Sequence, residues 1–516
     1  MNRQWWTLVV VCAATFILLL DVTIVVVALP NIQHDLQASF SGLQWFTDAY
    51  ALTLASVLLT TGSLADRYGR RLLFLIGLTV FTIGSLLCGI AADELMLILS
   101  RAVQGIGASI LFATSLALLA STFAGKQRGI AFGVWGAVAS VATALGPLLG
   151  GVLTTGISWR GIFLVNLPIG IVAFLIALRK VDESRAPYSS RIDWPGMATL
   201  TAGLFGLVYA LIRASASGWG DAGVLIAFVL AAVFLIAFVV VELRVSAPMF
   251  DLTLLRIPTF LGGSIAAFTM NASMFAMFLY LVLYLQNGLS FSSLDAGVRL
   301  LVASGCTFVA ATVAGRFVSQ IPARWLVGGG LVLVGAGLLL MRGLSADSSW
   351  THLIPGLIVS GIGTGMVNPP LASTAVGVVP VQRSGMASGV SQTFRQIGMA
   401  VGIALYGSIF ASALYGNLVG RLAGLPGPHA SAEQIAEAVR KGTPANAIAN
   451  AAPQAPEQLA GAVQASYPAA VNVLLLTSGL LAIVGGLLAL ILIRGKDFVP
   501  PAQPSSAGSQ QRAATG

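Results

Sequence analysis

The stretch GSLADRYGRRLL (62–73) decides how the rest of the chain is interpreted, because a weakened copy of it, GRFVSQIPARWL, occurs at 315–326. Two more segments repeat at nearly the same separation, roughly 255 residues: QGIGAS (104–109) with SGIGTG (360–365), and QRGIAFGV (127–134) with QRSGMASGV (382–390). Parallel repeats of this kind predict two similar halves whose site lies at their interface.

The composition places these halves in a membrane. Of the 516 residues, 57% are hydrophobic and only 9% are charged, and the mean hydropathy is +0.91. These values lie outside the range of soluble globular domains. The 58 glycines fit the same conclusion, since small residues let membrane helices approach closely. We therefore predict an all-α polytopic membrane protein.

Fourteen apolar runs are long enough to cross a bilayer, which takes roughly 17 to 25 residues each. We expect spans at 6–29, 44–64, 72–91, 95–121, 129–155, 161–179, 196–213, 222–242, 259–285, 294–317, 325–343, 352–379, 385–412 and 470–493. The repeats arrange them as 6+2+6: one bundle in 1–180, a linker with two extra helices in 181–258, and a second bundle in 259–494. We expect a long outer loop at 413–468 and a disordered cytoplasmic tail at 495–516.

The basic residues give the expected orientation. Most of the 27 lysines and arginines fall on the cytoplasmic side if both termini are cytoplasmic, as the positive-inside rule requires. No basic run exceeds two residues, so the net charge of +9 does not indicate nucleic-acid binding. The first apolar run is too long for a signal peptide, and we expect it to be retained. Arginine far outnumbers lysine and alanine is abundant, which suggests a GC-rich bacterial genome. For a polytopic protein of such an organism we expect the inner (plasma) membrane.

One carboxylate interrupts the first span, in LLLDVTIVVVALP (18–30). An acid at a helix centre costs about 2.5 to 3.5 kcal/mol on insertion scales, so it needs a partner or a function. Asp21 is our candidate proton carrier, with Arg101 of the fourth span as a nearby cation. The alternatives are a fixed structural role for Asp21 and a snorkelling one for Arg101. Asp48 in the second span can share or replace the proton role, or be solvated near the outer surface.

The loop GSLADRYGRR joins the second and third spans. Its glycines permit a tight turn and close helix contact. Asp66 can accept hydrogen bonds at a helix N-terminus or pair with an arginine, giving a latch between the bundles. Ordinary membrane anchoring explains the arginines equally well. The residues of this predicted cytoplasmic gating loop are Gly62, Asp66, Arg67, Gly69, Arg70 and Arg71.

The fifth span carries a stripe of small residues at three- and four-residue spacing, on which another helix can lie closely. Pro147 frees the carbonyl of Thr143, so a bend is expected there. The motif residues are Gly146, Pro147, Gly150 and Gly151. Packing alone is the alternative to a role in the transport motion.

GxLxDRxGRR in the loop resembles the signature of the major facilitator superfamily. LDVTIVVVALP, RAVQGIGAS, and GPLLGG followed by WRGIFLVNLPIG resemble the fourteen-helix drug:proton antiporter family. The resemblance implies a major facilitator fold and export of drugs, antibiotics or other small amphipathic compounds by alternating access. It also implies the proton as coupling ion, no other cofactor, and a monomer in the bilayer. The GPxxGG pattern is associated in that family with antiport.

Candidates for a substrate cavity come from three spans. Methionine and aromatic side chains adapt to varied apolar ligands, although core or lipid-facing packing explains them equally well. An arginine within a span has either a cavity or a packing role. The candidates are Gln104, Asn271, Met274, Phe278 and Arg395. Asp295, with Arg299 four residues on, is instead expected to be a structural helix cap.

Enzymatic chemistry is not indicated. There is no Walker loop, and Cys12, Cys88 and Cys306 lie in apolar runs without metal-ligand spacing. We predict a protein that is not an enzyme and holds no metal. Two alternatives to an exporter stay open: a proton-coupled importer of a small nutrient or metabolite, and a non-transporting membrane sensor. Transport assays under an imposed pH gradient would separate the three.

Overall fold

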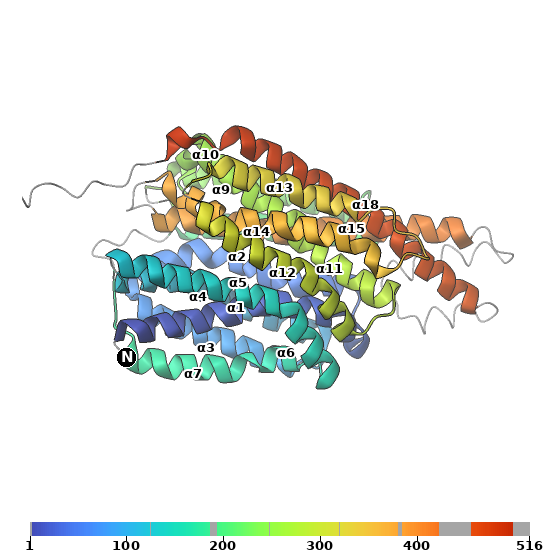
Figure 1. The fold of residues 1–516 in the computed structure, drawn as a ribbon, viewed down its shortest axis with the longest axis horizontal. Coiled ribbons are helices and arrows are strands. Elements are labelled where there is room, and N and C mark those ends of the chain that lie inside the picture. Colours follow the sequence, from blue (N-terminus) through green and yellow to red (C-terminus); the bar gives the residue numbers. More distant parts are fainter. Residues whose placement is uncertain are drawn as a thin grey trace, which may run out of the picture.

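The computed structural model describes residues 3–123, 125–185, 193–246, 248–318, 320–379, 384–422 and 456–498. These residues form long helices that run side by side along the long axis of the molecule, and no strand occurs among them (Figure 1). The bilayer core holds no water that could bond to backbone groups. A single segment that crosses it therefore forms a helix, because a helix satisfies its own backbone hydrogen bonds.

The first bundle follows the expected spans closely. Its helices are α1 (Arg3–Leu36), α2 (Phe40–Tyr68), α3 (Arg70–Gly89), α4 (Glu94–Thr122), α5 (Gly125–Gly156) and the pair α6 (Gly161–Leu164) and α7 (Asn166–Lys180), which together make the sixth. α5 continues through Pro147 as a single helix.

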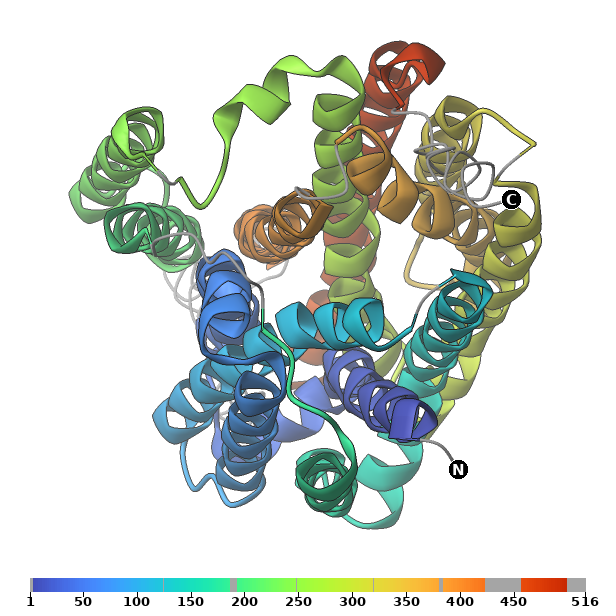
Figure 2. The ribbon, with the colours of Figure 1, turned by 90° about the vertical axis from the view of Figure 1, so that its left-hand side faces the viewer.

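Two extra helices, α8 (Trp194–Ser217) and α9 (Ala222–Arg244), form a hairpin between the halves. The hairpin lies at the periphery, where α8 packs against α2 of the first bundle and α15 (Ser384–Leu422) of the second (Figure 2). A short 3-10 turn, η1 (Leu252–Arg256), leads from α9 into the second bundle.

The second bundle opens with a helix that is not uniformly α-helical. α10 (Pro258–Met270) and α11 (Ala276–Leu283) are joined by a π-helical turn, η2 (Asn271–Phe275), and a second one, η3 (Tyr284–Gly288), follows α11. The remaining elements besides α15 are α12 (Ser293–Phe317), α13 (Ala323–Leu340), η4 (Trp350–Leu353), α14 (Ile354–Gly377), α18 (Pro456–Leu492) and η6 (Gly495–Asp497).

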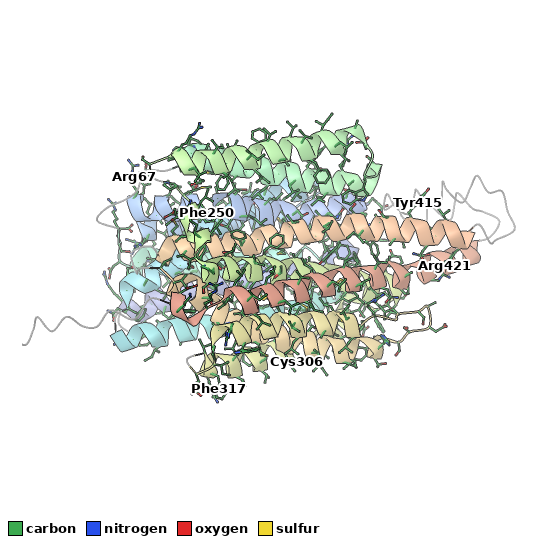
Figure 3. The ribbon with its side chains drawn as sticks, turned by 90° about the horizontal axis from the view of Figure 1, so that it is seen from above. Arg67, Phe250, Cys306, Phe317, Tyr415 and Arg421 are labelled. Atoms are coloured by element: carbon green, nitrogen blue, oxygen red, sulfur yellow. The ribbon has the colours of Figure 1, made fainter. Side chains whose placement is uncertain are left out.

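Both described ends of the chain lie on one side, which we call the terminal face; the other side is the opposite face (Figure 1). Arg67 and Phe250 lie near the terminal face, and Tyr415 and Arg421 lie near the opposite face (Figure 3). Thirteen of the described helices are long and apolar enough to cross a membrane. The expected span 44–64 coincides with α2, which is not among those thirteen, so a count of fourteen stays a prediction.

The expected boundaries were wrong around the long loop. α15 extends to Leu422 and α18 begins at Pro456, so both ends of the predicted loop 413–468 are helical, and 423–455 lie outside the described residues. The beginning of the predicted tail is also ordered by contacts. Asp497 accepts hydrogen bonds from the backbone nitrogen and the hydroxyl of Thr259, at 3.2 and 2.7 Å. Residues 499–516 lie outside the described part.

Glycines set how closely the helices pack. A Cβ on Gly335 would lie 2.6 Å from the carbonyl oxygen of Gly479, and one on Gly328 would lie 2.8 Å from that of Gly486. α13 and α18 therefore touch backbone to backbone, a contact that any larger residue would prevent. The high glycine content thus reflects helix contacts within the membrane.

Candidate functional site

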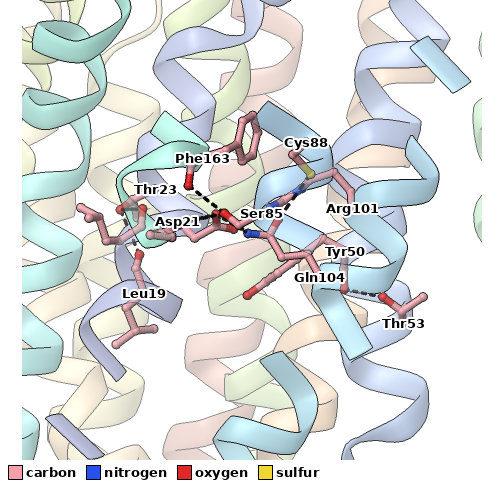
Figure 4. Close-up of polar contacts among 12 residues, drawn as sticks. Leu19, Asp21, Thr23, Tyr50, Thr53, Ser85, Cys88, Arg101, Gln104 and Phe163 are labelled. Carbon is pink, nitrogen blue, oxygen red and sulfur yellow. Dashed lines mark hydrogen bonds and ion pairs between the residues drawn. The ribbon is translucent and has the colours of Figure 1, made fainter. Parts of the chain in front are cut away.

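A buried ion pair links the first and fourth helices. Arg101 Nη1 on α4 donates to Asp21 Oδ2 on α1 at 2.5 Å, and the two side chains are 2% and 0% exposed (Figure 4). Burying two charges is costly unless their remaining hydrogen-bonding groups are also satisfied. The neighbouring side chains supply much of that satisfaction.

Two amide side chains donate to the carboxylate of Asp21, and Ser85 accepts from both of them. Gln104 Nε2 and Asn166 Nδ2 both donate to Asp21 Oδ1, at 2.9 and 3.2 Å. Each of these amides also donates to Ser85 Oγ, at 3.2 and 3.0 Å, and Ser85 in turn donates to the carbonyl of Phe163 at 2.9 Å. Helices α1, α3, α4 and α7 therefore meet in one polar network inside the first bundle.

Aromatic rings enclose the arginine of the pair. The guanidinium carbon of Arg101 lies 4.2 Å from the ring centroid of Tyr50, 5.2 Å from Phe46 and 6.0 Å from Phe163. Its distance to the Tyr50 ring is that of a cation–π contact. Gly105 lets α4 approach α2 here, since a Cβ on it would lie 2.5 Å from the Tyr50 carbonyl oxygen.

This geometry settles several sequence-based alternatives. The snorkelling interpretation of Arg101 was wrong, because its side chain is buried and paired. Gln104 is fully buried in the Asp21 network and does not line an open cavity. Asn166 and Ser85 were missed. Asn166 stands in WRGIFLVNLPIG, so an amide within an apolar span was the available signal, whereas a single serine on α3 gave none.

Asp48 lies apart from this network. Its side chain is fully buried, and neither of its carboxylate oxygens has a hydrogen-bond partner among the described residues. The solvated alternative for this residue was therefore wrong. Its helix, α2, packs against α15 of the second bundle, and Gln44, four residues before Asp48, donates to the Ile403 carbonyl of α15. Asp48 thus lies where α2 meets the second bundle.

Hydrogen bonds between the bundles gather toward the opposite face. Gln286 Nε2 donates to the Val27 carbonyl of α1 at 2.7 Å, and Ser293 Oγ donates to Asn31 Oδ1 at 2.6 Å. Gln44 on α2 donates to the Ile403 carbonyl at 3.4 Å. Ile403 stands at the middle of α15, and the other residues lie in the half of their helix away from the chain ends, so the bundles are closed against each other at that end.

The fifth-helix motif forms part of the same closure. Cβ atoms on Gly146 and Gly150 would lie 1.9 Å from Thr23 Oγ1 and 2.6 Å from the Ile24 carbonyl oxygen, both on α1. A Cβ on Gly151 would meet the backbone of Leu294 on α12 at 2.7 Å. Pro147 also faces α12, since a Cβ on Gly297 would lie 2.2 Å from its carbonyl oxygen. α5 is therefore packed between α1 and the second bundle.

Two contacts of the predicted gating loop reach the end of α7 and the segment that follows it. The backbone nitrogen of Arg70 donates to the Ser184 carbonyl at 2.9 Å, and the Arg71 guanidinium donates to the Leu178 carbonyl. Arg67 is exposed, and a Cβ on Gly62 would meet no described atom within 4 Å, so the described residues show no close contact at Gly62 of the kind expected. The side chain of Asp66 lies outside the described part, so the latch stays a hypothesis.

Glu183 ties that loop to the end of α7. Its two carboxylate oxygens accept from the backbone nitrogens of Arg71 and Leu72 at 3.0 and 3.1 Å, so it caps the N-terminus of α3. Gly69, between α2 and α3, has φ +126°, and a Cβ on it would lie 2.7 Å from the Glu183 carboxylate. The expected need for glycine at 69 is confirmed, but sequence reasoning missed Glu183.

The cavity candidates of the second bundle do not form one exposed face. Asn271 Nδ2 donates to the Ala267 carbonyl of its own helix at 2.9 Å, and Met274 is 3% exposed within the core. The face that they share with Phe278 was predicted from α-helical spacing. Both residues stand in the π-helical turn η2, whose wider spacing shifts them relative to Phe278. π-helical turns are frequent at functional sites.

Arg395 on α15 is half-buried, and no ion pair or hydrogen bond joins it to another described residue. Asp295 has the expected structural role, because its backbone nitrogen donates to Ser292 Oγ at 3.1 Å and its carboxylate pairs with Arg299 at 3.0 Å. The three cysteines are free. Within the described ranges, no group of three His, Cys, Asp or Glu residues could hold a metal ion.

Two helical bundles that repeat each other in sequence, closed together at one face and carrying a buried ion pair in the first half, define a secondary transporter of the two-bundle type. The chain belongs to the Major Facilitator Superfamily, whose profile matches residues 11–403. It is accordingly a multi-pass membrane protein of a family of transporters, which agrees at the family level with the prediction that it is not an enzyme.

Curated relatives are bacterial. The chain is 36% identical over 400 residues to "Multidrug resistance protein Stp" of Mycobacterium tuberculosis (strain CDC 1551 / Oshkosh), covering 77% of this chain and 74% of the relative. It is 36% identical over 403 residues to "Puromycin resistance protein pur8" of Streptomyces alboniger, covering 77% and 80%. It is 34% identical over 401 residues to "Tetracenomycin C resistance and export protein" of Streptomyces glaucescens, covering 77% and 74%.

Solved structures support the fold. A bacterial homolog to the human lysosomal transporter Spinster, in an inward-facing and occupied conformation, matches with a TM-score of 0.63 at 16% identity, over 96% of this chain and 98% of that one. The human organic anion transporter MFSD10 (TETRAN) matches with a TM-score of 0.60 at 16% identity, over 95% and 100%. At this identity the likeness concerns the fold alone.

Proposed function

We propose that the protein is a proton-coupled antiporter that exports drugs, antibiotics or other small amphipathic compounds by alternating access. The names of its relatives, which include resistance and export proteins, support the substrate class. The observation that carries the proton coupling is the ion pair between Asp21 and Arg101, sealed inside a transporter bundle.

Proton binding to Asp21 would turn this pair into a switch. A guanidinium remains charged at any physiological pH, so a protonated Asp21 would leave Arg101 buried without a counter-charge. Any rearrangement that brings Arg101 to water or to another anion would then be favoured. Because α1 also packs against α5, α11 and α12, a change at Asp21 would act on a helix that contacts both bundles.

Asp48 would carry a second proton in the arrangement seen here. An ionised carboxylate with no hydrogen-bond donor, buried between helices, costs several kcal/mol or more, and a neutral acid costs much less. Protonation of Asp48 would therefore favour contact between α2 and the second bundle. Its ionisation would favour separation of the bundles at the opposite face.

In membrane orientation, we assign the terminal face to the cytoplasm of a bacterial plasma membrane, because most basic loop residues lie on that side. The closed opposite face would then face outward, and the transporter would receive substrate from the inside. The proton would be the coupling ion of a monomer that needs no further cofactor.

Transport in everted membrane vesicles tests this proposal. The cytoplasmic side of the membrane faces the medium in such vesicles, so a proton gradient directed out of an acidic lumen should drive puromycin or tetracenomycin C into vesicles that contain the protein, and Asp21→Asn should abolish the uptake. The importer alternative predicts that substrate and protons cross in the same direction. A sensor predicts no gradient-driven uptake of any member of a drug panel, and either result would reject the exporter.

A further inference from the structure

A pair of carboxyl groups lies outside both bundles, at the terminal-face end of the α8–α9 hairpin. Asp193 is the N-cap of α8 and Glu242 stands in the last turn of α9, and each is 4% exposed. A Cβ built on Gly196 would lie 2.6 Å from Asp193 Oδ2 and 2.8 Å from Glu242 Oε1. The two oxygens therefore converge beside one glycine, whose missing side chain leaves them room.

Backbone groups occupy the other side of each carboxyl group. Asp193 Oδ1 accepts from the Gly196 nitrogen at 2.8 Å, and Glu242 Oε2 accepts from the Phe250 nitrogen at 3.2 Å. Asp193 Oδ2 also accepts a longer bond from the Met249 nitrogen, at 3.5 Å. Among the described residues, Glu242 Oε1 has no N–H or O–H donor, although it is buried and directed at Asp193.

A hydrogen bond between these two groups requires one proton. Two ionised carboxylates side by side repel each other, and a buried Oε1 without a donor adds a desolvation cost. No arginine or lysine of the described chain forms an ion pair with either group. Besides Arg213 on α8, Asp48 on α2 and Arg421 on α15, which lie toward the other end of these helices, the described charged side chains on the surrounding elements are Arg244 on α9, Asp251 and Arg256 around η1, Arg67 on α2 and Arg395 on α15.

We propose that Asp193 and Glu242 form a proton-binding site that fastens the segment 248–251 to the hairpin. That segment touches both bundles. Phe250 packs edge-on against Phe394 of α15, with ring centroids 6.3 Å apart, and the Thr60 hydroxyl of α2 donates to Met249 Sδ at 3.9 Å. Loss of the shared proton as the pH rises loosens the attachment of the hairpin to the bundles. The site does not depend on the direction or substrate of transport.

Infrared difference spectroscopy on the full chain in lipid nanodiscs tests the shared proton. In the wild type, we expect a C=O stretching band of a protonated carboxyl group that disappears as the pH rises. The same band should be missing from the spectra of the Glu242→Gln and Asp193→Asn variants. In either variant an amide can donate to the remaining carboxylate, so no proton has to be held. Asp221→Asn is the matched control: Asp221 caps the other end of α9, with no acid bonded to it, and its replacement leaves the band in place.

Hydrogen exchange of the Phe250 amide gives a second readout, after correction for the intrinsic dependence on pH. In the wild type, protection falls as the pH rises, whereas Glu242→Gln keeps it constant. An unchanged carboxyl band in both amide variants overturns the proposal. So does pH-independent protection in the wild type, a measurement that needs no variant to fold.

Discussion

Arg101 Nη1 donates to Asp21 Oδ2 at 2.5 Å across 80 residues of sequence, with both side chains buried. The contact joins α4, in the interior of the first bundle, to α1, which also packs against the second bundle. A proton that binds at this pair therefore acts where the two halves meet.

Asp21→Asn should destabilise the protein and abolish pH-driven transport. The substitution removes the counter-charge of a buried guanidinium, which costs about 3–5 kcal/mol when one partner of such a pair is lost. The double variant Asp21→Asn with Arg101→Gln should recover much of that stability, because it leaves no buried charge, yet remain inactive. Denaturant unfolding in detergent and vesicle transport measure the two effects.

The control lies on the same helix. Asp35 pairs with Arg160 at 2.6 Å, but its side chain is 49% exposed, so Asp35→Asn should change the free energy of unfolding by no more than about 1 kcal/mol. Wild-type transport in the double variant would show that the Asp21 carboxylate is not the proton carrier.

Asp48→Asn should hold the opposite face closed at every pH. The amide cannot ionise, so the charge that would separate α2 from the second bundle never forms. Spin labels on cysteines placed at His34 and Ser290, in a background without native cysteines, report the distance across that face. In the wild type, we expect a longer distance to gain population as the pH rises. Equal pH responses in the two proteins would exclude Asp48 as the titrating group.

Gly150→Ala should loosen the packing of α5 on α1. The added methyl would lie 2.6 Å from a backbone oxygen of α1, and overpacking of this kind costs about 1–3 kcal/mol. Gly156→Ala, on the same helix with nothing within 4 Å of its Cβ, should be neutral or slightly stabilising. Thermal unfolding compares the two, and equal midpoints would contradict the close contact.

Gly69→Ala should impair the terminal-face loop, whereas Gly62→Ala in the same motif should not. The backbone of Gly69 has φ +126°, a conformation that costs of order 1–3 kcal/mol for other residues, and its Cβ would clash with Glu183. Gly69→Ala combined with Glu183→Ala should recover only the part of the loss that is due to the clash. Chymotrypsin sensitivity at Tyr68 and thermal unfolding measure the effect. Identical behaviour of the two single variants would refute it.

The sequence alone is enough to establish the class of fold. Apolar runs must become helices in a bilayer, since no water is present there to satisfy an open backbone, and the repeats around 62–73 and 315–326 divide them into two halves. It also determined that Asp21 and Arg101 need partners, because a charge in an apolar span is costly. Hydropathy marks less clearly where a helix continues past the membrane, which is why the ends of α15 and α18 were misplaced.

The partners of those residues become known only from the folded arrangement of the helices. The bonds from Ser85, Gln104 and Asn166 depend on how four helices turn toward one another, and helix rotation follows from packing that no local pattern specifies. The closeness of Asp193 to Glu242 likewise depends on the folding back of a hairpin. A sequence gives the cost of burying each polar group, but the folded contacts decide which group offsets that cost.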